Sequence, residues 1–393
     1  MRIVVICRPD LPVPPLSGYG GLQRNIYDFV QEIDKRGHQV YLFASLDSDI
    51  TTLKNVQLFS NLKCATWANL VENIGFENRN ESEITSQATK VRLLESEYVN
   101  FVIKQLGAIE FDAILVAYDN LNLIKLLRPY HSKTVFSIRD NLFPETKEFL
   151  KFHPALRATD MAGHLVEENP ELKNISKVMW GINLSNYGYS ESYLSLSIET
   201  PQIPLLKKWQ SQRWDYLVMI AGIGEHKGQS TAIKIAEWAG APLIIAGTPQ
   251  DHVTLKKTNY FKNKIKPYLS DKIIYFGNAN EVQKMELFRF AKGSLAISGF
   301  ELPVFREPFG RSVVESLACG TPVIAYEYGS LPFLISHNIS GFLFKDVKGA
   351  VASVERLGEI CREEVRRWAE ENLSIERVAD EYLALFEKLN PLK

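Results

Sequence analysis

The sequence predicts a two-domain α/β protein with a parallel sheet in each half. Short apolar runs alternate with amphipathic helical patterns along both halves of the chain, which is the order of βαβ units. Parallel strands need a crossover between them, and the predicted helices supply it. The 393 residues suffice for two domains of ordinary size, each able to bury its own core.

The first half contains a clear βαβ unit. An apolar run at 3–7 is followed by a loop rich in Pro and Gly, a helical pattern and a second apolar run at 40–44. Residues 47–111 are more polar and predict only one helix, at about 90–106. Further strands are expected at 113–116 and 134–138, and we assign residues 1–187 to an N-terminal domain.

The second half repeats the alternation after a stretch without periodicity at 188–213, which we interpret as a linker. The following segment, 214–373, forms the predicted C-terminal domain, and 374–393 is a predicted helix with Ser374 as its cap. The elements expected in this domain are strands at 216–221, 243–246, 273–276, 294–298 and 323–326 and helices at 229–239, 281–291 and 311–319.

The charge balance excludes some partners. The chain has 45 basic and 46 acidic residues, without the surplus of a nucleic-acid-binding protein. No stretch approaches 18 apolar residues, so we expect a cytoplasmic protein. The four Cys include no CxxC pair, so metal or redox roles are not expected of them.

In each half of the chain, a glycine-rich loop follows the first predicted strand. Gly18-Tyr19-Gly20-Gly21 opens a helix, where free N–H groups and the positive end of the helix dipole favour an anion. The second, Gly222 to Gly228, places Lys227 at a helix start, where an ammonium can meet a phosphate. On these residues alone a tight turn and a solvated lysine remain equally good interpretations.

The segment from Glu307 to Glu315 carries the strongest signal. It reads Glu307-Pro308-Phe309-Gly310-Arg311-Ser312-Val313-Val314-Glu315 and runs from a loop into a helix. Both glutamates can then face one crevice, beside the N–H groups of Gly310 to Val313 at the helix start. This pattern favours a carboxylate for sugar or ribose hydroxyls next to an anion cradle.

This segment, together with Gly329-Ser330-Leu331-Pro332 and Gly341-Phe342-Leu343, resembles the donor-site signature of the retaining GT-B glycosyltransferases of glycosyltransferase family four (glycosyl transferases group 1). Arg36-Gly37-His38 and the early glycines are similar to its acceptor-side domain. The resemblance implies two Rossmann-like domains facing a central crevice, with the C-terminal helix returning to the first. It also implies sugar transfer from a nucleoside-diphosphate sugar to a hydroxyl acceptor with retention, without a metal or other cofactor.

The family's roles transfer to matching positions. Glu315 would hold the ribose hydroxyls and Glu307 the transferred sugar. The diphosphate and its surroundings would involve Gly20, Gly21, Lys227, Phe309, Gly310, Arg311, Ser312 and Val313.

Three positions depart from the family. Gly222 stands where an Arg is usual, and Arg311 could replace that phosphate donor. Arg139 stands where a His is common, and we expect it to face the reacting centre, although it cannot act as a base near pH 7. Trp180 could stack on a sugar or pack, and packing is favoured.

Alternatives follow from these departures. A catalytically impaired protein could serve as a nucleotide-sugar or glycan-binding subunit, including as a partner of another transferase. Asp47-Ser48-Asp49 could clamp a metal, although an acidic turn is favoured. An epimerase, a phosphorylase and, with less support, a dehydrogenase are the other enzymatic alternatives. A lipid acceptor would place the protein peripherally at a membrane.

Overall fold

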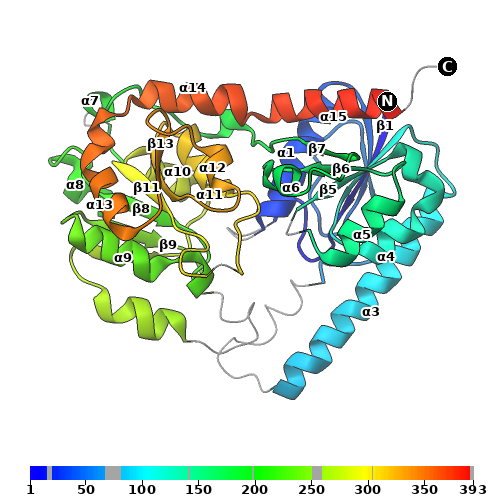
Figure 1. Cartoon of the computed structure of the whole chain (residues 1–393), viewed down its shortest axis with the longest axis horizontal. Coiled ribbons are helices and arrows are strands. Elements are labelled where there is room, and N and C mark those ends of the chain that lie inside the picture. Colours follow the sequence, from blue (N-terminus) through cyan, green and yellow to red (C-terminus); the bar gives the residue numbers. More distant parts are fainter. Residues whose placement is uncertain are drawn as a thin grey trace. The chain divides into compact units, whose positions relative to one another are not determined.

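The structure is a computed structural model and consists of two compact units (Figure 1). Unit 1 comprises Met1–Met179 and Ile375–Lys393, and unit 2 comprises Trp180–Ser374. The predicted linker, 188–213, therefore falls inside unit 2. The residues described are 1–15, 20–66, 81–139, 142–196, 199–249, 259–302 and 304–389.

Unit 1 is built on a parallel seven-stranded sheet with the strand order β3-β2-β1-β4-β5-β6-β7. The Val- and Ile-rich centre is buried on both faces, as expected of a parallel sheet covered by helices. The strands are β1 (Arg2–Cys7), β2 (Gln39–Phe43), β3 (Val56–Phe59), β4 (Ala113–Ala117), β5 (Thr134–Ile138), β6 (Arg157–Asp160) and β7 (Ile175–Lys177).

One face of this sheet packs into an apolar core, in which Phe136 and Ile138 of β5 meet Tyr98 and Val102 from helix α3. On the other side, Tyr382 lies edge-on to Phe29 at 5.3 Å, which joins helices α15 and α1. The helices of this unit are α1 (Gly21–Lys35), α3 (Glu81–Leu106), α4 (Leu121–Leu126), α5 (Pro144–Phe152), α6 (His164–Glu168) and α15 (Ile375–Leu389).

Unit 2 contains a parallel six-stranded sheet with the order β10-β9-β8-β11-β12-β13. Its strands are β8 (Leu217–Ile220), β9 (Leu243–Ala246), β10 (Ile273–Gly277), β11 (Gly293–Ala296), β12 (Val323–Tyr326) and β13 (Gly341–Phe344). Its helices are α7 (Tyr193–Leu196), α8 (Lys207–Gln210), α9 (Gln229–Trp238), α10 (Glu281–Arg289), α11 (Arg311–Ala318), α12 (Leu331–Leu334), α13 (Val347–Arg356) and α14 (Arg362–Asn372).

The strand order of each sheet reverses at one place, between β1 and β4 in unit 1 and between β8 and β11 in unit 2. Open α/β sheets bind ligands outside the carboxyl ends of their strands at such a switch point. The two-domain parallel α/β fold predicted from the sequence is confirmed, and the functional site is best sought at these two positions.

Candidate active site at the switch point of the second sheet

Lys227 and Glu307 form an ion pair at the switch point of unit 2. Lys227 follows β8 and Glu307 follows β11, and the Lys227 Nζ lies 2.6 Å from the Glu307 Oε2. Their side chains are 17% and 13% exposed, so the pair is shielded but still reachable. Burial raises the pKa of the Glu307 carboxyl, but the charge and hydrogen bond of Lys227 and a bond from Ser298 outweigh it and leave the pKa lowered. Glu307 is therefore an ionised hydrogen-bond acceptor.

His226 and Phe305 border this ion pair. The His226 and Phe305 rings lie 4.7 Å apart, and the Lys227 Nζ lies 5.0 Å from the Phe305 centroid. Burial and the neighbouring Lys227 lower the pKa of His226 to about 4. The imidazole is therefore neutral near pH 7, and Lys227 is the positive charge at this end of the site.

The loop that carries Lys227 is shaped by Gln229 at the start of α9. The buried Gln229 amide donates to the Gly222 carbonyl at 2.9 Å, and the Gly224 N–H donates to the Gln229 Oε1 at 3.3 Å. Gly228 has φ +79°, and a Cβ there would lie 2.9 Å from the Ile297 carbonyl oxygen. These contacts hold the loop close to β11 and direct Lys227 to Glu307.

The start of α11 lies beside Glu307. Gly310 precedes the helix with φ +88°, a conformation that glycine adopts readily. The predicted cradle differs from the structure at Val313, whose N–H donates to the Gly310 carbonyl at 2.9 Å because the first turn closes tightly. The amides of Gly310, Arg311 and Ser312 are the ones that helix geometry leaves without an intrahelical acceptor. Phe309 is buried, and its carbonyl accepts from the Ser330 hydroxyl at 2.9 Å.

Glu315, one turn into α11, is buried among three hydrogen-bond donors. Its Oε1 accepts from the Tyr187 hydroxyl at 3.1 Å, the Lys284 ammonium at 3.2 Å and the Arg311 Nε at 2.9 Å. The Lys284 Nζ also lies 3.3 Å from Oε2. Burial raises the pKa of the Glu315 carboxyl, but Lys284 and Arg311 outweigh it, so the pKa is lowered. Glu315 is therefore an ionised carboxylate that contacts two cations, Lys284 and Arg311.

The predicted site residues divide between the units. Gly20, Gly21 and Arg139 belong to unit 1, and the others belong to unit 2. Gly20 has φ +112° and Gly21 is the first residue of α1, whereas Gly18 and Tyr19 lie outside the described residues. Arg139 is 7% exposed at the end of β5, and burial lowers the pKa of its guanidinium.

Trp180 is fully buried, which agrees with the packing interpretation. The Asp49 Oδ1 accepts from the Thr51 N–H within a local turn, whereas the Asp47 carboxylate accepts from the N–H of Ala65, 18 residues away. Among the described residues, no group of three or more His, Cys, Asp or Glu side chains is placed to hold a metal ion. Within the same residues, no helix is long and apolar enough to cross a bilayer.

Sequence reasoning did not identify Tyr187, Lys284, His226 or Ser298 as part of this site. Tyr187 was assigned to the N-terminal domain, yet it contacts Glu315 inside unit 2. Lys284 lies on the polar side of a predicted helix, where a lysine is ordinary. Lys284 becomes notable only once α10 and α11 pack together, and Tyr187 only once its hydroxyl reaches Glu315.

Comparisons with known proteins give the family that part of the chain matches and the fold that the chain shares. Residues 207–373 match the family described as Glycosyl transferases group 1. Sucrose synthase 1 of Tulipa gesneriana is 33% identical over 108 residues, which cover 26% of this chain and only 13% of that protein.

Solved structures match the chain over nearly its whole length. Sucrose-phosphate synthase of Thermosynechococcus elongatus has a TM-score of 0.69 at 14% identity, covering 100% of this chain and 99% of that one. HepE of Anabaena in complex with UDP and glucose has a TM-score of 0.65 at 15% identity, covering 99% and 100%. The chain therefore has the fold of the GT-B glycosyltransferases, and its residues 207–373 carry a domain of the glycosyl transferases group 1 family.

Proposed function

We propose that this protein transfers a hexose from a nucleoside-diphosphate sugar to a hydroxyl acceptor, with retention of anomeric configuration and without a metal ion or other cofactor. The observation that carries the proposal is the ion pair between Lys227 and Glu307, 2.6 Å apart at the β8/β11 switch point and adjacent to the start of α11. A cation, open helix amides and an ionised carboxylate at one strand edge suit a diphosphate and the sugar attached to it.

The chemistry follows from where charge develops. As the bond to the sugar breaks, the leaving diphosphate gains negative charge, so groups that bind this charge stabilise the transition state more than the ground state. An ammonium has three donors, and Lys227 can therefore keep Glu307 while donating to a phosphate. The Gly310, Arg311 and Ser312 amides and the Arg311 side chain would add further donors. These positive groups would take the part that a metal ion has in other transferases.

The two glutamates would accept hydrogen bonds from hydroxyl groups of the donor. Glu307, which Lys227 keeps ionised, would accept a hydrogen bond from a hydroxyl of the transferred sugar. Glu315 Oε1 accepts from three donors, whereas Oε2 accepts from Lys284. Because a carboxylate oxygen can accept about two hydrogen bonds, Oε2 is the oxygen left for a ribose hydroxyl. The side chain is 3% exposed, so ribose binding would require a small displacement of its neighbours.

A catalytically impaired binding subunit is the second candidate, and Arg139 favours it. A guanidinium at this position cannot accept a proton near pH 7, and here it is buried in unit 1. The other proposed groups remain in place, and we therefore propose activity, located in the cytoplasm. Gly20 and Gly21 would contribute to diphosphate binding, and Arg139 would face the reacting centre.

The first experiment is a thermal-shift panel with UDP, GDP, ADP and dTDP and their common sugars. The solved complex of HepE contains UDP and glucose, which makes UDP-glucose the first donor to test. A ligand at about 100 times its Kd should add roughly 2.7 kcal/mol of stability, which is a shift of a few degrees. A selective response followed by donor turnover supports the transferase, whereas a response without turnover under any acceptor favours the binding subunit. No response to any nucleotide contradicts the transferase and favours a glycan-binding subunit instead.

A further inference from the structure

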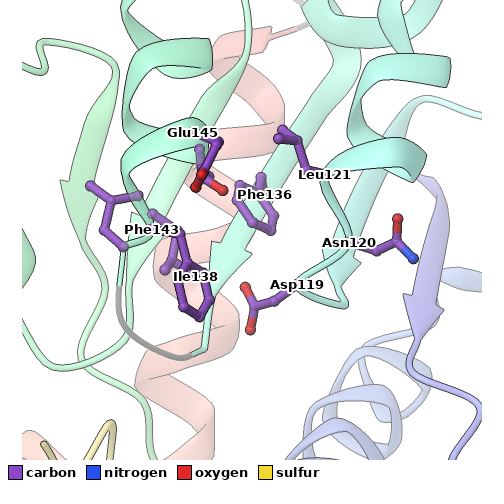
Figure 2. A pocket seen from close by; sticks show the side chains of 9 residues that line it. Asp119, Asn120, Leu121, Phe136, Ile138, Phe143 and Glu145 are labelled. Carbon is purple, nitrogen blue, oxygen red and sulfur yellow. The ribbon is translucent and has the colours of Figure 1, made fainter. Parts of the chain in front are cut away.

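Unit 1 contains a cavity of about 240 Å³ at the carboxyl ends of β4 and β5. Its walls include Phe136 and Ile138 of β5 and Phe143 of the loop that leads into α5. Figure 2 shows the carboxylates of Asp119 and Glu145 entering the same region from two different elements. Pockets for drug-sized ligands have volumes of roughly 300 to 1,000 Å³, so this smaller cavity suits a single ring.

Among the described residues that line the cavity, the charged ones, Asp119 and Glu145, are acidic. Asp119 follows β4 and Glu145 lies in the first turn of α5, and no Lys or Arg is among the described residues lining the space. Arg139, which follows β5, donates its backbone N–H to the Asp119 Oδ1 at 3.4 Å, and its guanidinium is buried. Carboxylates accept hydrogen bonds from hydroxyls and repel phosphates, so the cavity disfavours an anionic ligand.

The two helix starts at the cavity do not provide an anion site either. Asn120 caps α4, since its Oδ1 accepts from the Leu123 N–H at 2.9 Å. The amide nitrogen of the same side chain donates to the Tyr118 hydroxyl at 3.1 Å, so Asn120 has structural roles at both ends. At α5, the positive helix end is offset by the carboxylate of Glu145 in its first turn.

The apolar walls define the other face of the ligand. Phe136 is only 3% exposed and forms the floor, whereas Phe143 is 54% exposed at the rim. A ring that carries hydroxyls at its edge and C–H groups on its faces matches both the aromatic side chains and the carboxylates. A fully apolar ring would displace water from Asp119 and Glu145 without offering hydrogen bonds in exchange, which is costly.

We propose that this cavity binds the acceptor as an uncharged hydroxylated ring, a sugar or cyclitol without phosphate, whose hydroxyls donate to Asp119 and Glu145. Identifying this ring as the acceptor rests on the proposed transferase function. The ring-binding site itself stands on the cavity, its two carboxylates and its aromatic walls.

The test compares neutral and phosphorylated rings on the intact protein. Binding of glucose, myo-inositol, glucose 6-phosphate and inositol 3-phosphate is measured by saturation-transfer NMR and calorimetry. At least one neutral ring should bind, and its phosphate ester should bind more weakly. Tighter binding of the phosphorylated ring, or no binding of either neutral ring, overturns the proposal.

Matched variants locate the site. Asp119→Asn and Glu145→Gln should each weaken binding of the neutral ring about tenfold, the change expected from a loss of roughly 1.4 kcal/mol. Glu148→Gln is the control, because Glu148 lies on the same helix, is exposed and does not line the cavity. Equal affinities for the pocket variants and this control contradict the proposal.

UDP binding measured on the same samples reports on unit 2 independently. Pocket variants that lose the ring but retain UDP support the acceptor assignment. If the ring binds at the cavity and no nucleotide binds at all, the proposed transferase function fails while the ring-binding site stands. The two failures are therefore distinguishable.

Discussion

The ammonium of Lys227 lies 2.6 Å from the carboxylate of Glu307, although 80 positions separate them in the chain. Each follows a strand that borders the switch point of unit 2. The bond ties the two loops together, and it keeps Glu307 ionised in a shielded position.

Lys227→Met should weaken UDP binding by roughly 1.5 to 3 kcal/mol, the range for hydrogen bonds to charged groups. It should also raise the pKa of Glu307, because burial would remain while the largest opposing charge is removed. Calorimetry with UDP between pH 5 and 8 measures both effects. Lys272→Met, at an exposed position before β10, is the control, and equal UDP affinity for the two variants would argue against the assignment of Lys227.

Glu315→Ala should reduce both donor affinity and stability. Donor binding should fall by roughly 1 to 3 kcal/mol through the lost ribose contact. Unfolding should become easier by about 1 to 3 kcal/mol, because Lys284 and Arg311 would lose their shared carboxylate, while Lys284 keeps its ion pair with Glu281 at 2.9 Å. Urea unfolding and calorimetry separate the two, and Glu355→Ala at an exposed position of α13 provides the comparison. Wild-type donor affinity in a folded Glu315→Ala protein contradicts the ribose role.

Arg311→Ala tests whether this residue supplies the phosphate charge that Gly222 lacks. Donor affinity should fall about tenfold, a loss near 1.4 kcal/mol. The stability loss should be smaller than for Glu315→Ala, because Glu315 would keep Lys284 and Tyr187. Unchanged affinity for the nucleoside diphosphate would show that Arg311 serves Glu315 alone.

His226 should make the fold less stable in mild acid. Its folded pKa of about 4 lies below the ordinary 6.5, so between these values the unfolded chain binds more protons than the folded chain. Stability therefore decreases as the pH falls through this window, by roughly 1 to 2 kcal/mol after allowance for the solvated part of the ring. His226→Gln should flatten this part of the stability profile in denaturant titrations. An unchanged slope between pH 4 and 6.5 refutes the effect.

In unit 1, Asp10 should have the opposite effect on the pH dependence of stability. Burial, partly opposed by Arg8, raises the pKa of its carboxyl from 3.8 to about 6. The folded chain then binds more protons between these values, so this group costs stability as the pH rises through them. Asp10→Asn should raise the melting temperature at pH 8 and change it little at pH 4. A lower melting temperature at pH 8 would mean that the contacts of Asp10 with Arg8 and Gln23 outweigh its burial.

The sequence predicted the central strands and the edge strand β10 well, but it did not predict β3, β6, β7 or β13. Residues 3–7 and 40–44 are apolar enough to predict β1 and β2 almost to their ends. The polar segment Arg157–Asp160 forms β6 because β5 pairs with it, and nothing in its own residues indicates a strand. The predicted helix at 90–106 is part of α3, which starts at Glu81. The first residues of α3 are so polar that they show no helical periodicity of apolar residues.

The same limit applies to the site. The residues from Glu307 to Glu315 and Lys227 carry recognisable local patterns, whereas Lys284 and Tyr187 reach Glu315 only through tertiary packing. Hydrogen-bond partners that come from separate elements have no spacing rule that a single sequence could reveal.

The hydroxyl of Tyr382 on α15 bonds to Ser137 and Thr159 on two strands of unit 1. These hydrogen bonds attach α15 to the sheet of unit 1, although the ribosome synthesises α15 only after all of unit 2. During synthesis, unit 2 can fold as one continuous segment, whereas unit 1 cannot complete its fold until α15 has been synthesised. Nascent unit 1 should therefore remain sensitive to proteases until translation passes α15, and pulse-labelled chains stopped before Ile375 should be cleaved preferentially within residues 1–179.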